Sequence, residues 1–249
     1  MAFTQSFAAI SDIHGNIFAL EAVLGDIAQR GIERIVNLGD HLYGPLDPIA
    51  TAELLIPINL PSIRSNCDRW LYEAGTIAPP GRTIAKNRLA LSEQHRCWLE
   101  EMPQTLQIDD DVLLCHGTPW ADDVYLLEDV DQNGVHPRSV DDLAIHLSEV
   151  SAKLVLCGHS HRPGSAQLLN GTVVVNPGSV GLQVYTDESP YPHAMEAGTP
   201  HARYAVFTRE DSQWQFEHLT VSYDWEQAAK LAEQNGRSDW ARWLRTGRV

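Results

Sequence analysis

Seven side chains of metal-ligand type occur in five short clusters that are spread over more than half of the sequence. They are two carboxylates, one amide and four imidazoles: Asp12, His14, Asp40, Asn66, His116, His159 and His161. This mixture of oxygen and nitrogen ligands suits Mn²⁺, Fe²⁺, Zn²⁺, Co²⁺ or Ni²⁺ rather than Ca²⁺. Seven ligands can hold two cations with open positions, and cations about 3.5–4 Å apart activate water and clamp a phosphoryl group. The residue types therefore predict a two-metal site for phosphate ester hydrolysis.

Each cluster taken singly also has an ordinary explanation. An Asp-x-His pair such as Asp12 and His14 is usually without function, and a Gly-Asp pair such as Gly39-Asp40 is more often a turn. Asn66 alone is better explained as the cap of a short helix that begins near Arg69. His14, His116 and His159 weaken these explanations, because each lies beside a glycine after a segment of β-prone residues. The order of the clusters, rather than any one of them, carries the prediction.

The clusters follow short apolar segments that the residue pattern predicts as β-strands. These predicted strands span residues 7–10, 34–38, 62–65, 112–115 and 154–157. Ligand sites of open α/β sheets form at the edge where the carboxyl ends of the strands meet. Apolar residues at helical spacing predict a helix after Asn16, which can cap it. The alternation of strands and helices predicts an α/β architecture with the five clusters on one edge.

Further hairpins and helices are predicted around this frame. Helices are expected at residues 48–55 and 92–101, after Ser139 and after Asp224, and hairpins at 105–115, 165–175 and 204–221. Residues 182–200, rich in proline, glycine and acids, are predicted to be irregular. We expect this segment to form a mobile rim over the site, with a surface loop of no role as an equal alternative.

The composition is ordinary for a globular protein, and its charge bears on the partners that can be expected. Among 249 residues, 33 acids outnumber 18 bases and give a net charge of −15. Such a charge repels a polyanion, so no long nucleic acid is expected as a partner. No membrane span is predicted, nor a signal peptide at Met1–Ser6, which makes the cytoplasm the expected location. The four cysteines are widely spaced and are interpreted as reduced thiols.

The ordered clusters resemble the five motifs of the calcineurin-like metallophosphoesterases. The matching residues are Asp12-x-His14, Gly39-Asp40, Asn66-Cys67-Asp68, His116-Gly117 and Gly158-His159-Ser160-His161. The segment Asn176-Pro177-Gly178-Ser179 is similar to the turn that follows these motifs in a small bacterial and archaeal phosphodiesterase branch. The resemblance implies a four-layer αββα sandwich of two facing mixed β-sheets flanked by helices. It implies one domain over residues 1–249, with a rim segment at 182–200 and a C-terminal hairpin plus helix.

The resemblance also implies a role for each ligand residue. One divalent metal would be held by Asp12, His14 and His161, and a second by Asn66, His116 and His159, with Asp40 bridging the two. Mn²⁺ is the favoured ion, and Fe²⁺, Zn²⁺, Co²⁺ or Ni²⁺ would also fit. A water between the metals would attack phosphorus in line. Asn66, Cys67 and Asp68 are the expected catalytic positions, and Asn66 would also orient the phosphate.

Departures from the family pattern bear on the substrate. Many relatives have a histidine that protonates the leaving group where this chain has Cys67. A thiol is a poorer acid near neutral pH, so we expect leaving groups that need little protonation, such as aryl diesters or phosphoanhydrides. The equal alternative is that Cys67 only fills space. No arginine follows Asp40, which disfavours a phosphoprotein substrate, and Leu182-Gln183-Val184 stands where nearer relatives have Gln-Pro-Arg.

The predicted function is hydrolysis of phosphodiester or nucleotide phosphoanhydride bonds in small molecules. The alternatives are a phosphomonoesterase or protein phosphatase and, outside catalysis, a metal-binding interaction scaffold. Every expected ligand position is filled, which favours the enzyme. Four of the seven tryptophans fall in the last quarter of the chain: Trp214, Trp225, Trp240 and Trp243. They are expected to dock the terminal helix, with a homodimer surface as the alternative and the oligomeric state left open.

Overall fold

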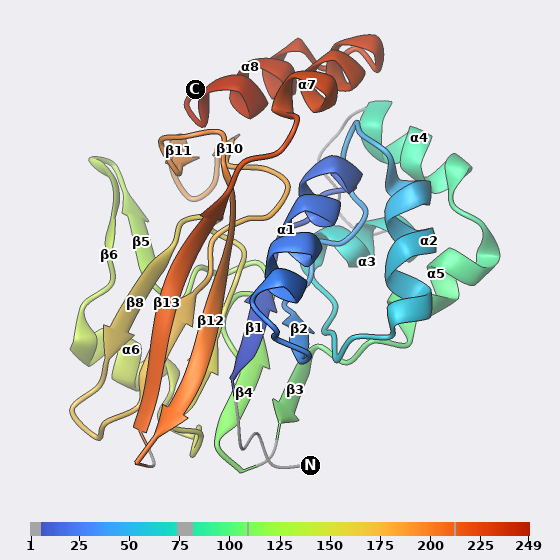
Figure 1. Cartoon of the computed structure of the whole chain (residues 1–249). Coiled ribbons are helices and arrows are strands. Elements are labelled where there is room, and N and C mark those ends of the chain that lie inside the picture. The colour runs from blue at the N-terminus through green and yellow to red at the C-terminus, as the bar shows by residue number, and fades with distance from the viewer. Residues whose placement is uncertain (1–5, 74–81, 109, 212) are drawn as a thin grey trace.

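The computed structural model describes residues 6–73, 82–108, 110–211 and 213–249. Residues 1–5, where no signal peptide is predicted, and Asp109, in the turn of a predicted hairpin, lie outside the described residues. The described chain contains two facing mixed β-sheets with helices on both outer sides (Figure 1). This arrangement confirms the predicted four-layer αββα sandwich.

The first sheet carries the earliest site residues and has the order β13-β12-β1-β2. Its strands are β1 (Phe7–Ile10), β2 (Ile35–Asn37), β12 (Ala202–Glu210) and β13 (Gln213–Val221). β1 pairs in parallel with β2, whereas β12 pairs antiparallel with both β1 and β13. The strand predicted at 62–65 is wrong, because only one bridge forms there, between Asn37 and Ser62. Pro61 has no N–H to donate, and Ser65 is already used as a helix cap.

The second sheet carries the later site residues and has the order β3-β4-β7-β9-β8. Its strands are β3 (Thr105–Ile108), β4 (Val112–Cys115), β7 (Leu154–Leu156), β8 (Gly164–Gln167) and β9 (Val173–Asn176). β4, β7 and β9 are parallel, which brings the ends of β4 and β7 to the same edge. The antiparallel pairs β3–β4, β8–β9 and β12–β13 confirm the three predicted hairpins.

Apolar side chains fill the space between the two sheets and fix their relative position. Phe7 and Val36 of the first sheet pack with Leu114 and Leu156 of the second, and all four are fully buried. The rings of Phe7 and Phe207 stack with centroids 4.9 Å apart. Burying such side chains contributes about 1.5–3 kcal/mol each. Because this layer is dry and close-packed, the strand ends that carry the site residues are held rigidly.

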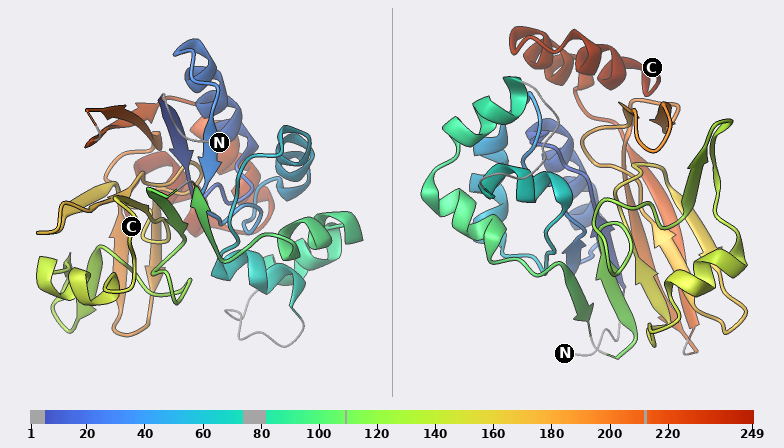
Figure 2. Two further views of the ribbon diagram at one scale, coloured as in Figure 1. Left: turned by 90° about the horizontal axis from the view of Figure 1, so that it is seen from below. Right: turned by 180° about the vertical axis from the view of Figure 1, so that it is seen from behind.

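Helices cover both outer faces of the sandwich (Figure 2). On the first sheet lie α1 (Ile17–Gln29) and α2 (Pro48–Ile58), and α6 (Val140–His146) covers the second. Beyond them come α3 (Asn66–Tyr72), α4 (Arg82–Ala90) and α5 (Glu93–Glu100). The predicted caps Asn16, Ser139 and Asp224 each accept a hydrogen bond from the first turn of their helix, and Ser92, where a helix was predicted to begin, does the same. The alternative in which Asn66 caps a helix is wrong, because Ser65 caps α3.

The segment at 182–200 is more regular than its composition predicts. β10 (Val184–Asp187) pairs with β11 (His193–Glu196) in an antiparallel hairpin. Val184 and Met195 are fully buried and anchor the hairpin. The many polar residues around them obscure the β-strand pattern in the sequence. A second unpredicted hairpin joins β5 (Glu128–Asp131) to β6 (Gly134–Pro137). The Asn133-Gly134 turn was the available signal for that hairpin.

Two C-terminal helices, instead of the single one predicted, lie across one end of the sheets (Figure 1). These are α7 (Trp225–Gln234) and α8 (Ser238–Thr246). Trp240 and Trp243 are buried and dock α8 against β10, whereas Trp214 belongs to the core between the sheets. None of the helices in the described part of the chain combines the length and apolar character that a membrane span requires.

Candidate metal centre

The predicted ligand residues lie where strands end, and the structure brings them to one place. Asp12 follows β1, Asp40 follows β2, His116 follows β4, and His159 and His161 follow β7. Possible metal-binding atoms of four residues lie within 4.8 Å of one another: those of Asp12, His14, Asp40 and His161. This group, which we call the Asp/His cluster, combines residues more than 140 positions apart in sequence. The cluster has the composition and compactness of a divalent metal site.

The remaining predicted ligands adjoin the Asp/His cluster. His116 Nε2 lies 3.4 Å from Asp40 Oδ1 and 3.9 Å from Asp12 Oδ1. The rings of His116 and His159 have centroids 5.2 Å apart. Asn66 and His159 line the same pocket as Asp40. Asp40 therefore has His14 beside one carboxylate oxygen and His116 beside the other, an arrangement in which one carboxylate can serve two cations.

The backbone at this site adopts a conformation that L residues seldom take. Five of the seven predicted ligands have φ between 53° and 68°: Asp12, His14, Asp40, His159 and His161. For residues other than glycine, such left-handed conformations cost about 1–3 kcal/mol each and gather at functional sites. They persist here because each residue directly follows a strand or turn that the core holds in place. The conformation turns the side chains inward, toward one another.

Hydrogen bonds to backbone carbonyls orient three of the imidazole rings. His14 Nδ1 lies 2.8 Å from the Tyr43 oxygen, His116 Nδ1 2.7 Å from the Leu38 oxygen, and His161 Nδ1 2.5 Å from the Leu182 oxygen. With Nδ1 donating to a carbonyl, the Nε2 lone pair of each ring is directed into the site. His14 Nε2 and His161 Nε2 are 3.0 Å apart. Two such lone pairs repel each other unless a proton or a cation lies between them.

Several buried polar atoms at the site have no hydrogen-bond partner in the described structure. They are Asp12 Oδ2, Asp40 Oδ1, Asn66 Oδ1 and His116 Nε2. A buried polar group without a partner costs about 1–3 kcal/mol, so a cluster of four is unusual. All four are ligand atoms for a divalent cation, and all belong to predicted ligands. The residues present therefore fit a bound metal.

Burial and neighbouring charges control the ionisation of these side chains. Burial raises the pKa of Asp12 to about 6 and lowers the pKa of His159 to about 4. Burial would also raise the pKa of Asp40, but His116 and His14 outweigh it and hold that pKa well below its usual range. Burial lowers the pKa of His161 well below its usual value. Asp40 thus stays ionised, while His159 and His161 stay neutral, which is the form that binds metal.

Comparison with known proteins assigns the family. Residues 6–195 match the model of the calcineurin-like phosphoesterase superfamily domain. The chain belongs to this family. It is similar to an uncharacterized protein of Methanocaldococcus jannaschii, at 26% identity over 94% of each chain. Its fold is similar to that of a metallophosphoesterase from Sphaerobacter thermophilus, with a TM-score of 0.72, 23% identity, and coverage of 95% of this chain and 99% of that one. A putative diadenosine tetraphosphatase has a TM-score of 0.54 and 17% identity, with 88% and 95% covered.

The side chains of the Asn66-Cys67-Asp68 motif of this calcineurin-like phosphoesterase lie in two different environments. Asn66 and Cys67 line the pocket, and burial raises the pKa of the Cys67 thiol well above its usual value. Asp68 is fully buried behind them. Its carboxylate accepts hydrogen bonds from Ser65 Oγ at 2.8 Å and from the Asp40 backbone N–H at 3.1 Å. Asp68 therefore contacts the backbone of Asp40 instead of the pocket.

His41 lies behind the phosphoesterase site with Asp68 and does not reach solvent near the pocket. It is fully buried, and its Nδ1 lies 2.8 Å from Asp68 Oδ2. Its ring contacts Trp98, with centroids 5.2 Å apart. The sequence signals for this pair were the histidine directly after Asp40 and the acid at the third position of α3.

Two tyrosines that the motifs do not include contact His159 of the phosphoesterase site. The Tyr185 hydroxyl of β10 lies 2.9 Å from the His159 carbonyl oxygen and 2.8 Å from the Tyr125 hydroxyl. Tyr125 stacks on His159 with centroids 4.7 Å apart, and its hydroxyl lies 3.0 Å from His193 Nε2. Tyr185 and His193 both belong to the 182–200 segment. The rim segment therefore reaches the site through the β10–β11 hairpin.

The turn after β9 packs directly on the strand end that carries Asp12. Val180 N–H donates to Ser11 O at 2.9 Å, and Gly181 N–H donates to Asp12 O at 3.0 Å. A Cβ at Gly181 would lie 1.7 Å from the carbonyl oxygen of Ile13. Only glycine permits this contact, because the clashing atom is backbone and cannot rotate away. The turn therefore holds the backbone of the Asp12–His14 segment.

Replacing Gly181 by alanine is expected to lower the free energy of unfolding by about 3 kcal/mol or more, because the backbones must separate. Urea denaturation followed by circular dichroism measures the change. Gly25 is the control, because nothing lies within 4 Å of a Cβ there and the residue is inside α1. Gly25→Ala is expected to stabilise the protein by about 0.5–1 kcal/mol. Equal effects at the two glycines would contradict this account of the turn.

Proposed function

We propose that this calcineurin-like phosphoesterase hydrolyses phosphodiester or phosphoanhydride bonds of small molecules with two divalent cations. The observation that carries the proposal is the set of four buried ligand atoms without partners: Asp12 Oδ2, Asp40 Oδ1, Asn66 Oδ1 and His116 Nε2. These atoms belong to four segments that are separate in the sequence and meet only in the folded structure. Membership of the family supports the same assignment. The chain is proposed to be a single domain, because its C-terminal helices line the same pocket as the ligands.

Each ligand residue is assigned a role in this proposal. Asp12, His14 and His161 hold one cation, Asn66, His116 and His159 hold the other, and Asp40 contacts both. When bound, the cations lower the pKa of a water and offset the charge that develops on the phosphoryl oxygens. Mn²⁺ is the proposed ion, since mixed oxygen and nitrogen ligands suit it. Asp68 and His41 act as positioning residues, because they hold the backbone of Asp40 and contact no solvent.

The pocket beside the ligands supports a small-molecule substrate. It has a volume of about 660 Å³ and is lined by His14, Asp40, Asn66, His159 and His161 together with residues of α4, α7 and α8. This volume falls in the range of small-molecule sites. A net charge of −15 disfavours a long polyanion. A mononucleotide or an aryl phosphodiester has the size and charge that the site accommodates.

Hydrolysis of bis(4-nitrophenyl) phosphate by the Mn²⁺-loaded protein tests the function. We expect turnover with Mn²⁺, none after chelation, and recovery when Mn²⁺ is restored. 4-Nitrophenyl phosphate, measured in parallel, separates a diesterase from a phosphomonoesterase, because the monoester should be hydrolysed more slowly. Absence of turnover with every divalent metal would support the alternative of a binding scaffold. Faster hydrolysis of the monoester would contradict the diesterase assignment.

Replacing Cys67 by histidine is expected to change the dependence on the leaving group. Cys67 lines the pocket next to Asn66, so an imidazole there can donate a proton to the departing oxygen. General acid catalysis of this kind contributes about 10²–10⁴-fold, mainly for poor leaving groups. We expect Cys67→His to accelerate the release of alcohols with poor leaving ability. These are methanol from methyl 4-nitrophenyl phosphate and the alcohols of dialkyl esters. Hydrolysis of bis(4-nitrophenyl) phosphate should be accelerated less. Cys97→His, at an exposed cysteine on α5, is the control. An unchanged leaving-group dependence would assign Cys67 to packing alone.

A further inference from the structure

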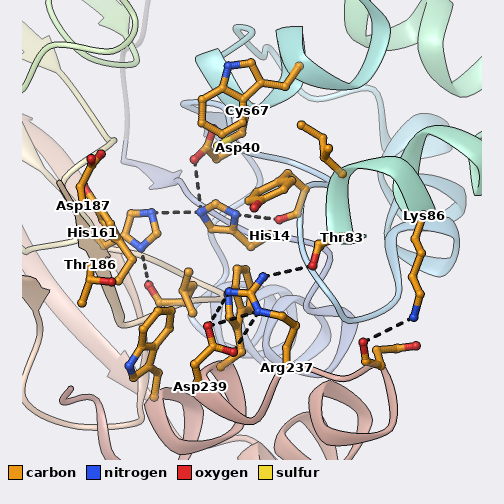
Figure 3. Close-up of a pocket in the computed structure, with 18 of the residues that line it drawn as sticks. His14, Asp40, Cys67, Thr83, Lys86, His161, Thr186, Asp187, Arg237 and Asp239 are labelled. Carbon is orange, nitrogen blue, oxygen red and sulfur yellow. Dashed lines mark hydrogen bonds and ion pairs between the residues drawn. The ribbon is translucent and has the colours of Figure 1, made fainter. Parts of the chain in front are cut away.

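The pocket extends well beyond the predicted metal ligands. From the Asp/His cluster it continues along Tyr43 and Trp70 to Thr83 and Lys86 of α4. Its other wall is built by the residues at 234–243, which include the turn between α7 and α8. In Figure 3, Arg237, Asp239, Thr83 and Lys86 surround one side of the space that His14 and His161 border on the other. The whole pocket, at about 660 Å³, therefore has room for a substrate that extends beyond the metal ligands.

Aromatic rings form a continuous wall from the metal ligands into the outer pocket. The ring of Trp240 lies 5.8 Å from that of His14, and Tyr43 lies 6.3 Å from Trp240 and 5.7 Å from Trp70. Trp70 is half-buried, whereas Trp240 is buried. The three rings come from a loop, from α3 and from α8. Rings gathered from three separate elements make an apolar wall that a planar group can pack against.

Trp70 is placed next to the position that phosphate would occupy. It follows Asn66 by four residues in α3, so both side chains lie on the same face of this helix. Asn66 is a proposed ligand and lines the pocket with Trp70. A phosphoryl group held at Asn66 therefore places its ester substituent one helical turn further along, beside the Trp70 ring.

Beyond the metal ligands the pocket is lined by two basic and two acidic side chains, whose formal charges sum to zero: Arg237, Lys86, Asp187 and Asp239. Arg237 donates to Asp239 from Nε at 2.9 Å and from Nη2 at 2.7 Å, and its Nη1 donates to Thr83 Oγ1 at 3.1 Å. The guanidinium also lies over the Trp240 ring, 5.3 Å from its centroid. An arginine already bound by a carboxylate offers little free charge to a second phosphate. The outer pocket is therefore suited to a planar group without charge.

The geometry points to a binding subsite for an uncharged aromatic group, of the aryl or nucleobase class, formed by Tyr43, Trp70 and Trp240. This inference rests on the proposed function and specifies its substrate as a phosphate ester that carries such a group. Trp70 supplies a ring surface for stacking, and the Arg237–Asp239 pair fixes the wall formed by α8. A substrate is thus held at both ends, with its phosphorus at the metal ligands and its ring in the outer pocket.

Two phosphonates that cannot be hydrolysed test the subsite without relying on turnover. Phenylphosphonate and methylphosphonate share one head group and differ in the aromatic ring, and calorimetric titration of the Mn²⁺-loaded protein measures both affinities. We expect phenylphosphonate to bind about tenfold more tightly, as stacking on an aromatic side chain provides. Trp70→Leu is expected to reduce this affinity ratio to under about threefold while leaving the affinity for methylphosphonate unchanged. Trp70→Phe is expected to keep most of the affinity ratio. Trp225→Leu is the control, because Trp225 is also half-buried but lies outside the pocket.

The outcomes separate the subsite from the proposed function. Equal affinity of the two phosphonates, or a ratio that survives Trp70→Leu, would overturn the subsite while leaving the metal site in place. Tighter binding of methylenediphosphonate than of phenylphosphonate would also overturn it, since the outer pocket would then recognise an anion. No binding of any phosphonate would overturn both proposals. Binding with the expected ratio but no ester hydrolysis would support the subsite and contradict the enzymatic function.

Discussion

Replacing Asp40 by asparagine is expected to lower diester hydrolysis by on the order of 10³-fold or more. Asp40 lies between His14, at 3.2 Å from Oδ2, and His116, at 3.4 Å from Oδ1, and among the described residues its Oδ1 has no hydrogen-bond partner. An amide keeps the shape but loses the negative charge that the two proposed cations need. Steady-state assays with bis(4-nitrophenyl) phosphate measure turnover, and elemental analysis measures the metal content of the same sample.

Asp141→Asn is the matched control, because Asp141 is exposed in the first turn of α6 and lies outside the pocket. It is expected to keep turnover and metal content unchanged. The Asp40 variant should retain its circular dichroism spectrum, which separates loss of metal from loss of fold. Full turnover by the Asp40 variant, with normal metal content, would contradict the bridging role.

Chelation of the metal is expected to lower the thermal unfolding midpoint by about 5–15 °C. A ligand present at 100–1,000 times its dissociation constant stabilises the folded state by about 3–4 kcal/mol. In a chain of this size each kcal/mol shifts the midpoint by about 2–4 °C. A bound cation would also supply partners for buried atoms such as Asp12 Oδ2 and Asn66 Oδ1, which have none within the described protein. Differential scanning calorimetry, with and without chelator, measures the shift.

The Asp40→Asn protein serves as the control for chelation, because its midpoint should respond much less to added Mn²⁺. Restoring Mn²⁺ to the chelated wild-type protein should restore its midpoint. An identical midpoint with and without metal would show that the buried ligand atoms are satisfied in another way. That result would remove the physical reason for placing cations at the site.

The proposed metal ligands could be predicted from the sequence because they combine two local signals. An apolar strand followed directly by Asp or His next to glycine is visible within a few residues, as at Ile10 to Gly15. The order of such segments then predicts a shared edge, because parallel strands place their carboxyl ends together. The α/β architecture and the convergence of Asp12, His14, Asp40 and His161 required no other information, whereas the four-layer sandwich was implied by the family resemblance.

The surroundings of the site depend on contacts between distant segments, which local patterns do not encode. Tyr185 contacts His159 only because the β10–β11 hairpin folds back, and its strands were hidden among prolines and acids. The outer pocket depends on α8 docking through Trp240, so Arg237 gave no local signal of its position. The expected strand at 62–65 does not form, because Ser65 instead caps helix α3.

Anomalous diffraction from crystals of the Mn²⁺-loaded protein can locate the proposed cations. Two manganese peaks about 3.5–4 Å apart are expected. One should lie among Asp12, His14, Asp40 and His161, and the other among Asp40, Asn66, His116 and His159. A single peak, or peaks placed away from Asp40, would contradict the proposed two-metal site.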